Sequence, residues 1–342
     1  MAAQKIEETI VINAAIIGLG WWGRYIVETL QGKSEKIGFS RGIDIAPDAA
    51  EDIAAAHSLT VTVDYTDALN DSAIDAVVLA TPHSFHEEQI ITAAKAGKHV
   101  FCEKPLALNL ASAERSVAAC EDANVVLGLG HERRFEPAMR EIKRLVESGE
   151  LGTIMHIEAN FSHDKLANMD ADNWRMSSVE NPAAAMTTTG IHLTDAYLNI
   201  VGPIEQVFAL TATRNPANAS GDILSFVLRF KSGATGAYTS ILETPLYMRL
   251  AVYGSEAWVE ARDYTHPSEM GTTDLFVSRE EGQIEKTMFQ DVDTVKLNFE
   301  AWADAITGDA DYPFTTEQKL QNIAVLEAIC QSAETGALIT VQ

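Results

Sequence analysis

Lys104 lies near the end of the run Val100-Phe101-Cys102-Glu103-Lys104-Pro105, downstream of a glycine-rich loop in the same part of the chain. An ammonium group at hydrogen-bond distance from a hydroxyl stabilises developing alkoxide charge or relays the hydroxyl proton. Burial beside a cationic ring lowers the pKa of a lysine toward neutrality, which suits this chemistry. We therefore expect Lys104 to act in hydride transfer to a nicotinamide; the alternative is a surface lysine paired with Glu103.

His192 is the second residue suited to proton transfer. It lies in the run Thr187-Thr188-Thr189-Gly190-Ile191-His192-Leu193-Thr194-Asp195, which opens an apolar helix ending near Gly202 and Pro203. An imidazole carries a proton well at neutral pH, although a lone histidine before an apolar helix is more often structural. Asp195, one helical turn later, either orients this imidazole or is an acid favoured by the helix dipole.

The loop Gly18-Leu19-Gly20-Trp21-Trp22-Gly23 lies between elements that would position a nucleotide. The apolar run 11–17 before it predicts a buried parallel strand, and residues 24–30 after it predict a helix. In this setting the first glycine makes a tight turn, the second lets the backbone approach a pyrophosphate, and the third lets helix and strand pack closely. The pattern indicates a dinucleotide site.

Asp44 supports the same site and bears on the cofactor. It ends the next apolar stretch, 37–43, and falls 21 positions after Gly23, where an acid accepts hydrogen bonds from the adenosine ribose. Because this carboxylate would repel a 2′-phosphate, NAD is favoured over NADP. Arg41 weakens the preference, since a nearby arginine would compensate for a phosphate, so NADP stays open.

The first part of the chain alternates strand-like and helix-like runs. Further strands are expected at 74–80, 98–102 and 125–129, and helices at 86–96, 112–122 and 137–148. This alternation implies an α/β fold with a parallel, doubly wound sheet. Ligands bind beyond the carboxyl ends of such strands, where Thr81-Pro82-His83 and Glu103-Lys104-Pro105 lie. Pro105 is expected to hold its turn through a cis bond.

A different pattern begins after Gly130, where we place the boundary between a dinucleotide-binding domain, 1–130, and a second domain, 131–342. Longer half-buried strands are expected at 154–161, 205–213, 223–230, 236–242 and 249–254. They indicate a mostly antiparallel second sheet. The long polar stretch 162–189 is expected to be a loop with a short helix, and long ordered loops are often functional.

Composition limits the partners. The chain has 342 residues, 46% hydrophobic and 22% charged, with a formal net charge of −24. Nucleic acid and anionic membrane surfaces would repel such a chain. No apolar stretch approaches the length of a membrane span, and residues 1–8 lack the features of a secretory signal, so we expect a cytoplasmic protein without disulfides.

No metal is expected. His83 and His86 are spaced i and i+3, but no carboxylate or cysteine completes a ligand set with them. Hydride transfer to NAD needs no metal.

The motifs taken together resemble the glucose-fructose oxidoreductase / inositol dehydrogenase / rhizopine catabolism protein (Gfo/Idh/MocA) family, over nearly the whole length of the chain. Each motif alone is weak, but their order and spacing are specific. The matching motifs are the glycine loop, Ala80-Thr81-Pro82 with His86, Glu103-Lys104-Pro105, Gly130-His131-Glu132-Arg133-Arg134-Phe135, Gly190-Ile191-His192-Leu193-Thr194-Asp195 and Ser332-Ala333-Glu334-Thr335-Gly336.

This resemblance implies an N-terminal Rossmann domain and a C-terminal α/β domain whose open, mostly antiparallel sheet serves substrate binding and oligomerisation. It also implies catalytic roles for Lys104 and His192. Many members carry an aspartate four residues before this histidine, where this chain has Thr188. Either Lys104 and His192 suffice with Thr188 binding substrate, which we favour, or activity is weakened. The residues expected to bind the cofactor are Gly18, Gly20, Trp21, Trp22, Gly23, Asp44, Thr81, Pro82, His83, His86, Glu103 and Lys104.

Similarity places Arg133, Arg134, Asn173, Trp174 and Arg175 near the substrate. An arginine there would fork onto a carboxylate or onto sugar hydroxyls, and Trp174 would offer a stacking face. For each of these residues surface or domain-junction pairing, or packing, is the competing interpretation. The residues expected to bind substrate are Thr188, Trp174, Arg175, Arg133 and Asp195.

Three functions follow. The favoured one is an NAD(P)-dependent dehydrogenase acting on a hydroxyl or keto group of a sugar, polyol or sugar acid. The alternatives are a dihydrodiol dehydrogenase or NADPH-dependent ketone reductase, and a non-catalytic dinucleotide-binding sensor. An exposed antiparallel sheet face would be unfavourable in a monomer, so a homodimer or homotetramer is expected.

Overall fold

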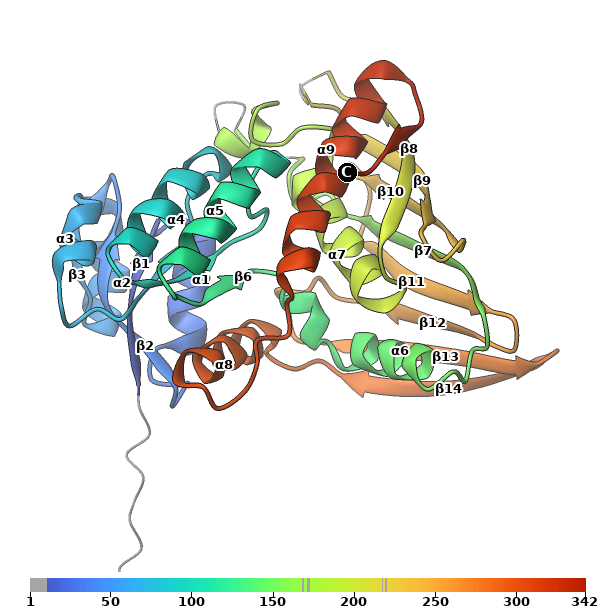
Figure 1. Ribbon diagram of the computed structural model, residues 1–342, viewed down its shortest axis with the longest axis horizontal. Helices are drawn as coiled ribbons and strands as arrows, with labels where there is room; N and C mark the ends of the chain where they lie inside the picture. The colour runs from blue at the N-terminus through green and yellow to red at the C-terminus, as the bar shows by residue number, and fades with distance from the viewer. Residues whose placement is uncertain (1–10, 168, 171–172, 217, 219) are drawn as a thin grey trace, which may run out of the picture.

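Two β-sheets organise the chain in the computed structural model, which describes residues 11–167, 169–170, 173–216, 218 and 220–342. Figure 1 shows them side by side, the first sheet built from the N-terminal part and the second from the C-terminal part. Residues 1–8, considered above as a signal, lie outside the described residues. No described helix has the length and apolar character needed to cross a membrane.

The first sheet is parallel throughout, in the order β3-β2-β1-β4-β5-β6. Its strands are β1 (Ile12–Ile17), β2 (Ile37–Ile43), β3 (Thr60–Thr62), β4 (Ala76–Leu79), β5 (His99–Cys102) and β6 (Leu127–Leu129). Its helices are α1 (Trp21–Leu30), α2 (Glu51–His57), α3 (Tyr65–Asn70), α4 (His86–Lys95) and α5 (Leu110–Asp122). The strand order reverses between β1 and β4, so a ligand crevice opens at their carboxyl ends. The predicted doubly wound fold is confirmed.

The second sheet has the order β14-β13-β12-β11-β7-β10-β9-β8-β15. Every neighbouring pair is antiparallel except β7 with β10. Its strands are β7 (Ile154–Ser162), β8 (Ile204–Ala212), β9 (Ile223–Phe230), β10 (Thr235–Ile241), β11 (Tyr247–Gly254), β12 (Trp258–Asp263), β13 (Thr272–Glu280), β14 (Gln283–Gln290) and β15 (Ile339–Thr340). The mostly antiparallel second sheet is therefore confirmed as well.

Helices cover one face of this sheet. They are α6 (Pro137–Glu147), α7 (Ile191–Ile200) and α9 (Thr316–Thr335), and α9 lies against β8, α5 and α7. It thereby connects the two halves of the molecule (Figure 1). The predicted helix after His192 is present as α7, and α1 begins at Trp21, three residues earlier than Arg24, because the helix starts inside the glycine loop.

Helix α8 (Thr294–Thr307) completes the core of the first sheet although it comes from the C-terminal part of the chain. Phe299 stacks on Phe101 of β5 with ring centroids 3.9 Å apart, and Trp302 packs edge-on against the same ring at 5.4 Å. All three side chains are buried. The division at residue 130 stays a prediction, but the second part of the chain supplies one face of the first core.

Short helical turns connect the longer elements, and most of them carry residues of the predicted site. They are η1 (Pro47–Ala50), η2 (His83–Phe85), η3 (Glu132–Phe135), η4 (Trp174–Met176) and η5 (Met186–Gly190), the last a π-helical turn. The last two belong to the long polar stretch 162–189. Each of η2, η3, η4 and η5 lies beside the crevice between the sheets.

Candidate active site

A cleft of about 710 Å³ opens between the glycine loop and the second sheet. A cavity of this size is typical of small-molecule sites. Of the residues predicted from sequence, those that line it are Gly20, Trp21, Trp22, Thr81, His83, Glu103, Lys104, Arg133, Trp174, Arg175, Thr188 and His192. Those that lie outside its lining are Gly18, Gly23, Asp44, Pro82, His86 and Asp195.

The glycine loop has the geometry that a pyrophosphate requires. Gly18 has a φ of +91°, and an added Cβ there would lie 2.7 Å from the carbonyl oxygen of Ala80. A Cβ at Gly23 would lie 1.9 Å from the carbonyl oxygen of Gly18, so helix α1 packs against the turn only through a glycine. Nothing lies within 4 Å of a Cβ at Gly20, which leaves open space at the helix N-terminus for a phosphate.

Asp44 stands at the end of β2 and fixes this loop. Its Oδ2 accepts a hydrogen bond of 2.7 Å from the Leu19 amide, and its Oδ1 accepts one of 2.8 Å from the Ala46 amide. Arg41, which left NADP open, pairs with Asp71 at 2.9 Å. That guanidinium already has a carboxylate partner, so it does not offset the charge of Asp44.

Lys104 reaches across the cleft to the second half of the molecule. Its Nζ donates hydrogen bonds of 3.2 Å to the carbonyl oxygens of Thr187 and Thr188, both in η5. Burial lowers the pKa of Lys104, while the carboxyls of Glu103 and Glu132 oppose that shift. The Lys104–Pro105 peptide bond is cis, as expected.

Two buried carboxyls accompany Lys104. Glu103 is 7% exposed and Glu132 is 8% exposed, and both line the cleft. Burial raises the pKa of each to about 7, and the charge of Glu103 adds to the shift of Glu132. An added Cβ at Gly130 would lie 2.4 Å from the Glu103 carboxylate, so this glycine makes room for it.

Glu132 was not predicted, although it lies within a motif that carried the family resemblance. The signal was an acid in η3, three residues after β6, at the same edge of the sheet as Lys104. No ion pair joins its side chain to another described residue. A carboxyl that is half ionised near neutral pH is suited to accept or release a proton.

His192 lines the cleft at the start of α7 and is 7% exposed. Burial, followed by the charge of Lys104, lowers its pKa well below the usual value, so the ring is neutral at neutral pH. Its Nδ1 is buried and has no hydrogen-bond partner among the described residues. The ring of His131 packs edge-on against it, with centroids 5.7 Å apart.

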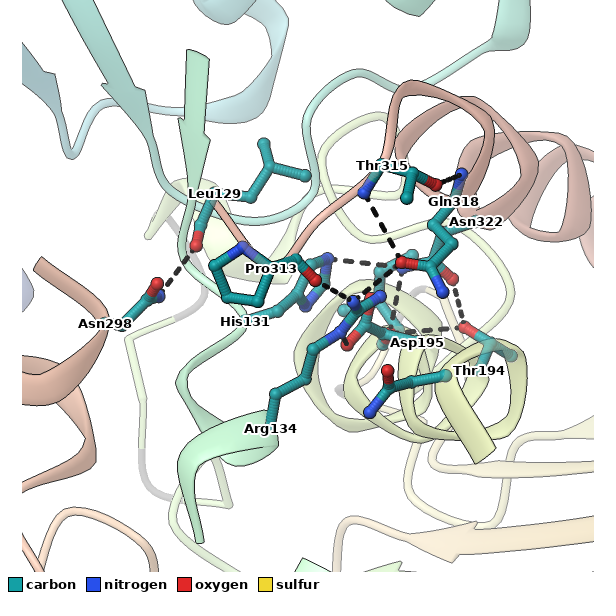
Figure 2. Close-up of polar contacts among 12 residues, drawn as sticks. Leu129, His131, Arg134, Thr194, Asp195, Asn298, Pro313, Thr315, Gln318 and Asn322 are labelled. Carbon is teal, nitrogen blue, oxygen red and sulfur yellow. Dashed lines mark hydrogen bonds and ion pairs between the residues drawn. The ribbon is translucent and has the colours of Figure 1, made fainter. Parts of the chain in front are cut away.

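Asp195 does not orient His192. Its two carboxylate oxygens accept hydrogen bonds of 2.7 and 2.6 Å from Nε and Nη2 of Arg134. The other guanidinium nitrogen of Arg134, Nη1, donates to the carbonyl oxygen of Pro313 and to Gln318. Figure 2 shows this network, with His131 beside Asn322. Arg134 and Asp195 thus join η3, α7 and the start of α9, and neither lines the cleft.

Arg133 lines the cleft, but its guanidinium is already held. Nε donates to Glu136 at 2.8 Å, and Nη2 donates to Glu136 and to Asp263 of β12, each at 3.2 Å. These two carboxylates occupy some of the N–H donors of the guanidinium, so only the remaining donors are left for a ligand. The guanidinium also lies over the ring of Phe161, 5.1 Å from its centroid.

The turns after β4 and β5 are held together by His86. This ring is fully buried, and its two nitrogens face the carbonyl oxygens of Pro105 at 2.8 Å and Thr81 at 3.1 Å. It therefore positions the turn that carries Lys104. His83 does face the cleft; its Nδ1 bonds the carbonyl oxygen of Glu180 at 2.7 Å, and burial lowers its pKa to about 2.

The long loop contributes Trp174 and Arg175. The Arg175 guanidinium lies over the Trp174 ring at 4.2 Å, and that ring packs edge-on against His83. Asn173 caps η4 by accepting from the Arg175 amide at 3.0 Å. Thr188 donates to Asn181 at 3.3 Å, so its hydroxyl faces the cleft lining.

Three residues on the far side of the cleft were not among those predicted from the sequence. His163, Lys165 and His266 line it there. His163 follows β7 directly, and His266 lies between β12 and β13, so about one hundred residues separate them along the chain. No local pattern joins two positions that meet only because β7 and β12 both pair with β11. Within the described part of the chain, no group of three or more His, Cys, Asp or Glu side chains could hold a metal ion.

Comparisons with known proteins agree with this geometry. Residues 12–131 match the model of an oxidoreductase family with an NAD-binding Rossmann fold, and residues 139–260 match the corresponding GFO/IDH/MocA C-terminal domain. An uncharacterized oxidoreductase, YrbE of Bacillus subtilis, is 30% identical and covers 97% of both chains. The myo-inositol 2-dehydrogenase of Thermotoga maritima is 33% identical over 73% of this chain and 72% of its own.

Among solved structures, the WlbA dehydrogenase from Bordetella pertussis, in complex with NADH and UDP-GlcNAcA, superposes with a TM-score of 0.82. It is 25% identical and covers 97% of this chain and 99% of its own. The two-sheet architecture is therefore shared over nearly the full length.

Proposed function

Because the chain belongs to the Gfo/Idh/MocA family of NAD-binding oxidoreductases, we propose that it oxidises a hydroxyl group of a sugar, polyol or sugar acid, with the keto compound reduced in the reverse direction. Relatives that act on polyols, such as the myo-inositol 2-dehydrogenase, support this substrate class. The observation that carries the proposal is that Lys104 and His192 line one cleft together with Gly20 of the nucleotide loop.

The bound nicotinamide supplies a hydride acceptor at the alcohol carbon. Lys104 handles the other product, the hydroxyl proton. Because burial lowers its pKa, Lys104 supplies a neutral amine, whose nitrogen contacts the substrate hydroxyl and accepts its proton as the carbonyl forms, becoming an ammonium. The neutral His192 donates a hydrogen bond to the same oxygen. Atoms balance, since the alcohol loses one hydride to the cofactor and one proton to the protein.

Glu132 receives that proton next in our proposal. Its carboxyl lines the cleft with Lys104, and burial raises its pKa to about 7. A group so placed takes a proton from an ammonium whose own pKa is lowered and returns it to solvent. Thr188 offers no carboxylate, but Glu132 in η3 places a carboxyl in the same cleft, and its charge raises the pKa of Lys104.

We propose NAD as the preferred cofactor. The carboxylate of Asp44 is held rigidly by two backbone amides, and Arg41 is paired with Asp71. The Asp44 carboxylate would repel a 2′-phosphate, and the paired Arg41 would not compensate for that repulsion. A dihydrodiol dehydrogenase or NADPH-dependent ketone reductase would require the opposite preference, and membership of an oxidoreductase family disfavours a non-catalytic sensor.

We also propose a homodimer or homotetramer in the cytoplasm. Helices cover one face of the second sheet, and the strands carry exposed apolar side chains, among them Val227, Leu210 and Tyr247. Association through the other face would cover such groups. Light scattering is expected to give a mass of two or four chains, and a stable monomer would contradict this.

The function is tested by following the reduction of NAD and NADP with a panel of polyols, sugars and sugar acids. We expect NADH formation with at least one member and weaker activity with NADP. Dinucleotide binding without turnover across the whole panel would overturn the proposal.

A further inference from the structure

Two histidines form the end of the cleft that faces the second sheet. His163 follows the last residue of β7 and is 4% exposed, and His266 lies in the turn between β12 and β13. Their ring centroids are 5.5 Å apart, with the rings nearly perpendicular at 78°. Both side chains line the same cavity as Lys104 and His192. Two imidazoles thus stand together on the side of the cavity that the nucleotide loop does not form.

Hydrogen bonds fix which nitrogen of each ring carries the proton. The Nδ1 of His163 accepts from the Lys165 amide at 3.2 Å. The Nδ1 of His266 accepts from the Ser268 amide at 3.2 Å, and with Nδ1 as acceptor the Ser268 hydroxyl, 2.8 Å away, donates to it as well. A ring nitrogen that accepts from an N–H carries no proton of its own, so each neutral ring is protonated at Nε2. Within the described part of the chain, neither Nε2 has a hydrogen-bond partner. Two N–H donors are therefore left for a ligand.

The rings stay neutral at physiological pH. Burial and the ammonium of Lys165 lower the pKa of His163 to about 4 and that of His266 to about 3. The nearby Asp164, which is exposed, opposes the shift of His163 only in part. Both Nε2–H groups are thus uncharged hydrogen-bond donors at physiological pH.

The charges around these donors favour an anion. The positive charges of Lys165, Arg133 and Lys104 all lower the pKa of His266. Lys165 is anchored at 2.9 Å by Glu269, which does not line the cleft. The cleft-lining acids, Glu103 and Glu132, belong instead to the turns after β5 and β6 of the first sheet. The cavity is therefore polarised, with carboxyls near the nucleotide loop and N–H donors at the far end.

We propose that His163 and His266 bind a carboxylate carried by the substrate, at a position separate from the carbon that is oxidised at Lys104. The preferred substrate is then a sugar acid or a cyclic hydroxy acid rather than a neutral sugar. Two neighbouring N–H donors match the two oxygens of a carboxylate, and hydrogen bonds to an ionised acceptor are stronger than those to a hydroxyl. This inference rests on the proposed function, because Lys104 and His192 define the reacting end of the cavity.

The test compares matched pairs of hexuronates and hexoses of gluco, galacto and manno configuration, together with the hexose 6-phosphates, in NAD reduction. For the best pair we expect the kcat/KM of the acid to exceed that of the neutral sugar by roughly ten- to hundred-fold, the worth of a charged hydrogen bond. His163→Leu and His266→Leu should each remove this preference through KM. His156→Leu, the same change on β7 but outside the cleft lining, should keep it.

A second measurement separates this inference from the proposed function. Calorimetric titration of the NADH-loaded wild-type protein with each hexuronate requires no turnover. Binding that is lost in His163→Leu, without any turnover, would support the carboxylate site and count against the dehydrogenase proposal. Two results would overturn the carboxylate site and leave the dehydrogenase proposal intact. One is turnover of the neutral sugars with no preference for the hexuronates, and the other is a preference for the hexose 6-phosphates.

Discussion

The two sides of the cleft are built in different ways. The nucleotide side is formed by turns that directly follow β1, β4, β5 and β6 of one parallel sheet, and it carries the carboxyls Glu103 and Glu132. The far side collects residues from the end of β7, the long loop and the turn between β12 and β13, and it carries N–H donors. The difference indicates a division of labour, with cofactor and proton handling on one side and substrate selection on the other.

Lys104→Met tests the nucleotide side with the largest expected effect. We expect turnover to fall by roughly 10²- to 10⁴-fold, the usual contribution of acid-base catalysis. Binding of NADH, measured by fluorescence, should be retained because the glycine loop is intact. Lys95→Met, at the exposed end of α4, is the matched control. Unchanged turnover in Lys104→Met would remove that residue from the mechanism.

Arg134→Met tests whether the two sides are held together behind the cleft. The ion pair of Arg134 with Asp195 is buried, and removing one partner leaves an uncompensated charge. We expect the free energy of unfolding, measured with urea, to fall by about 3–5 kcal/mol. Arg144 forms two ion pairs but is half exposed, so Arg144→Met should leave stability nearly unchanged. Equal effects of the two substitutions would refute the structural role of Arg134.

Asp44→Ser tests the adenosine end of the nucleotide side. Loss of the carboxylate should weaken NAD binding by roughly ten-fold or more, as expected for a charged hydrogen bond. NADP binding should weaken less or improve, since the repulsion of the 2′-phosphate is removed. Titrations of both cofactors, with Asp48→Ser on the neighbouring η1 as control, provide the measurement. A parallel loss for both cofactors would show that Asp44 only supports the loop.

Glu132→Gln should give the smallest change, seen in the pH profile. Oxidation needs the proton acceptors deprotonated, so kcat/KM should rise with pH through an apparent pKa near 7. Removing the Glu132 charge lowers the pKa of Glu103 and of Lys104, so the rise should move to lower pH by about one unit or less. Glu132→Asp should keep the wild-type profile. A profile unaltered in Glu132→Gln would exclude Glu132 from proton handling.

The same division explains how much could be predicted from sequence. Residues on the nucleotide side follow strands within a few positions, so Lys104, Thr81 and the glycines could be placed at one sheet edge from local pattern. On the far side, His163 and His266 meet only through strand pairing, which no local pattern encodes. Strand β14 was also missed, because nearly all its residues are exposed and it lacks an alternating pattern.

Some side chains take partners that the sequence does not reveal. Asp195 was expected either to orient His192 or to be an acid favoured by the helix dipole, and its carboxylate pairs with Arg134, which comes from a segment sixty-one residues away. His86 was predicted to belong to the cofactor site, and its ring lies buried between two backbone carbonyls, where it positions the turn that carries Lys104. In both cases a buried polar group takes the partner that satisfies it, and that partner is set by tertiary packing.

The most direct test of the division of labour is to determine kcat and KM of Lys104→Met and His163→Leu with the best substrate of the panel, alongside the dissociation constant of NADH. We predict that Lys104→Met loses kcat, that His163→Leu raises KM with kcat nearly unchanged, and that both retain NADH affinity. A loss of kcat in His163→Leu equal to that in Lys104→Met would contradict the division between the two sides.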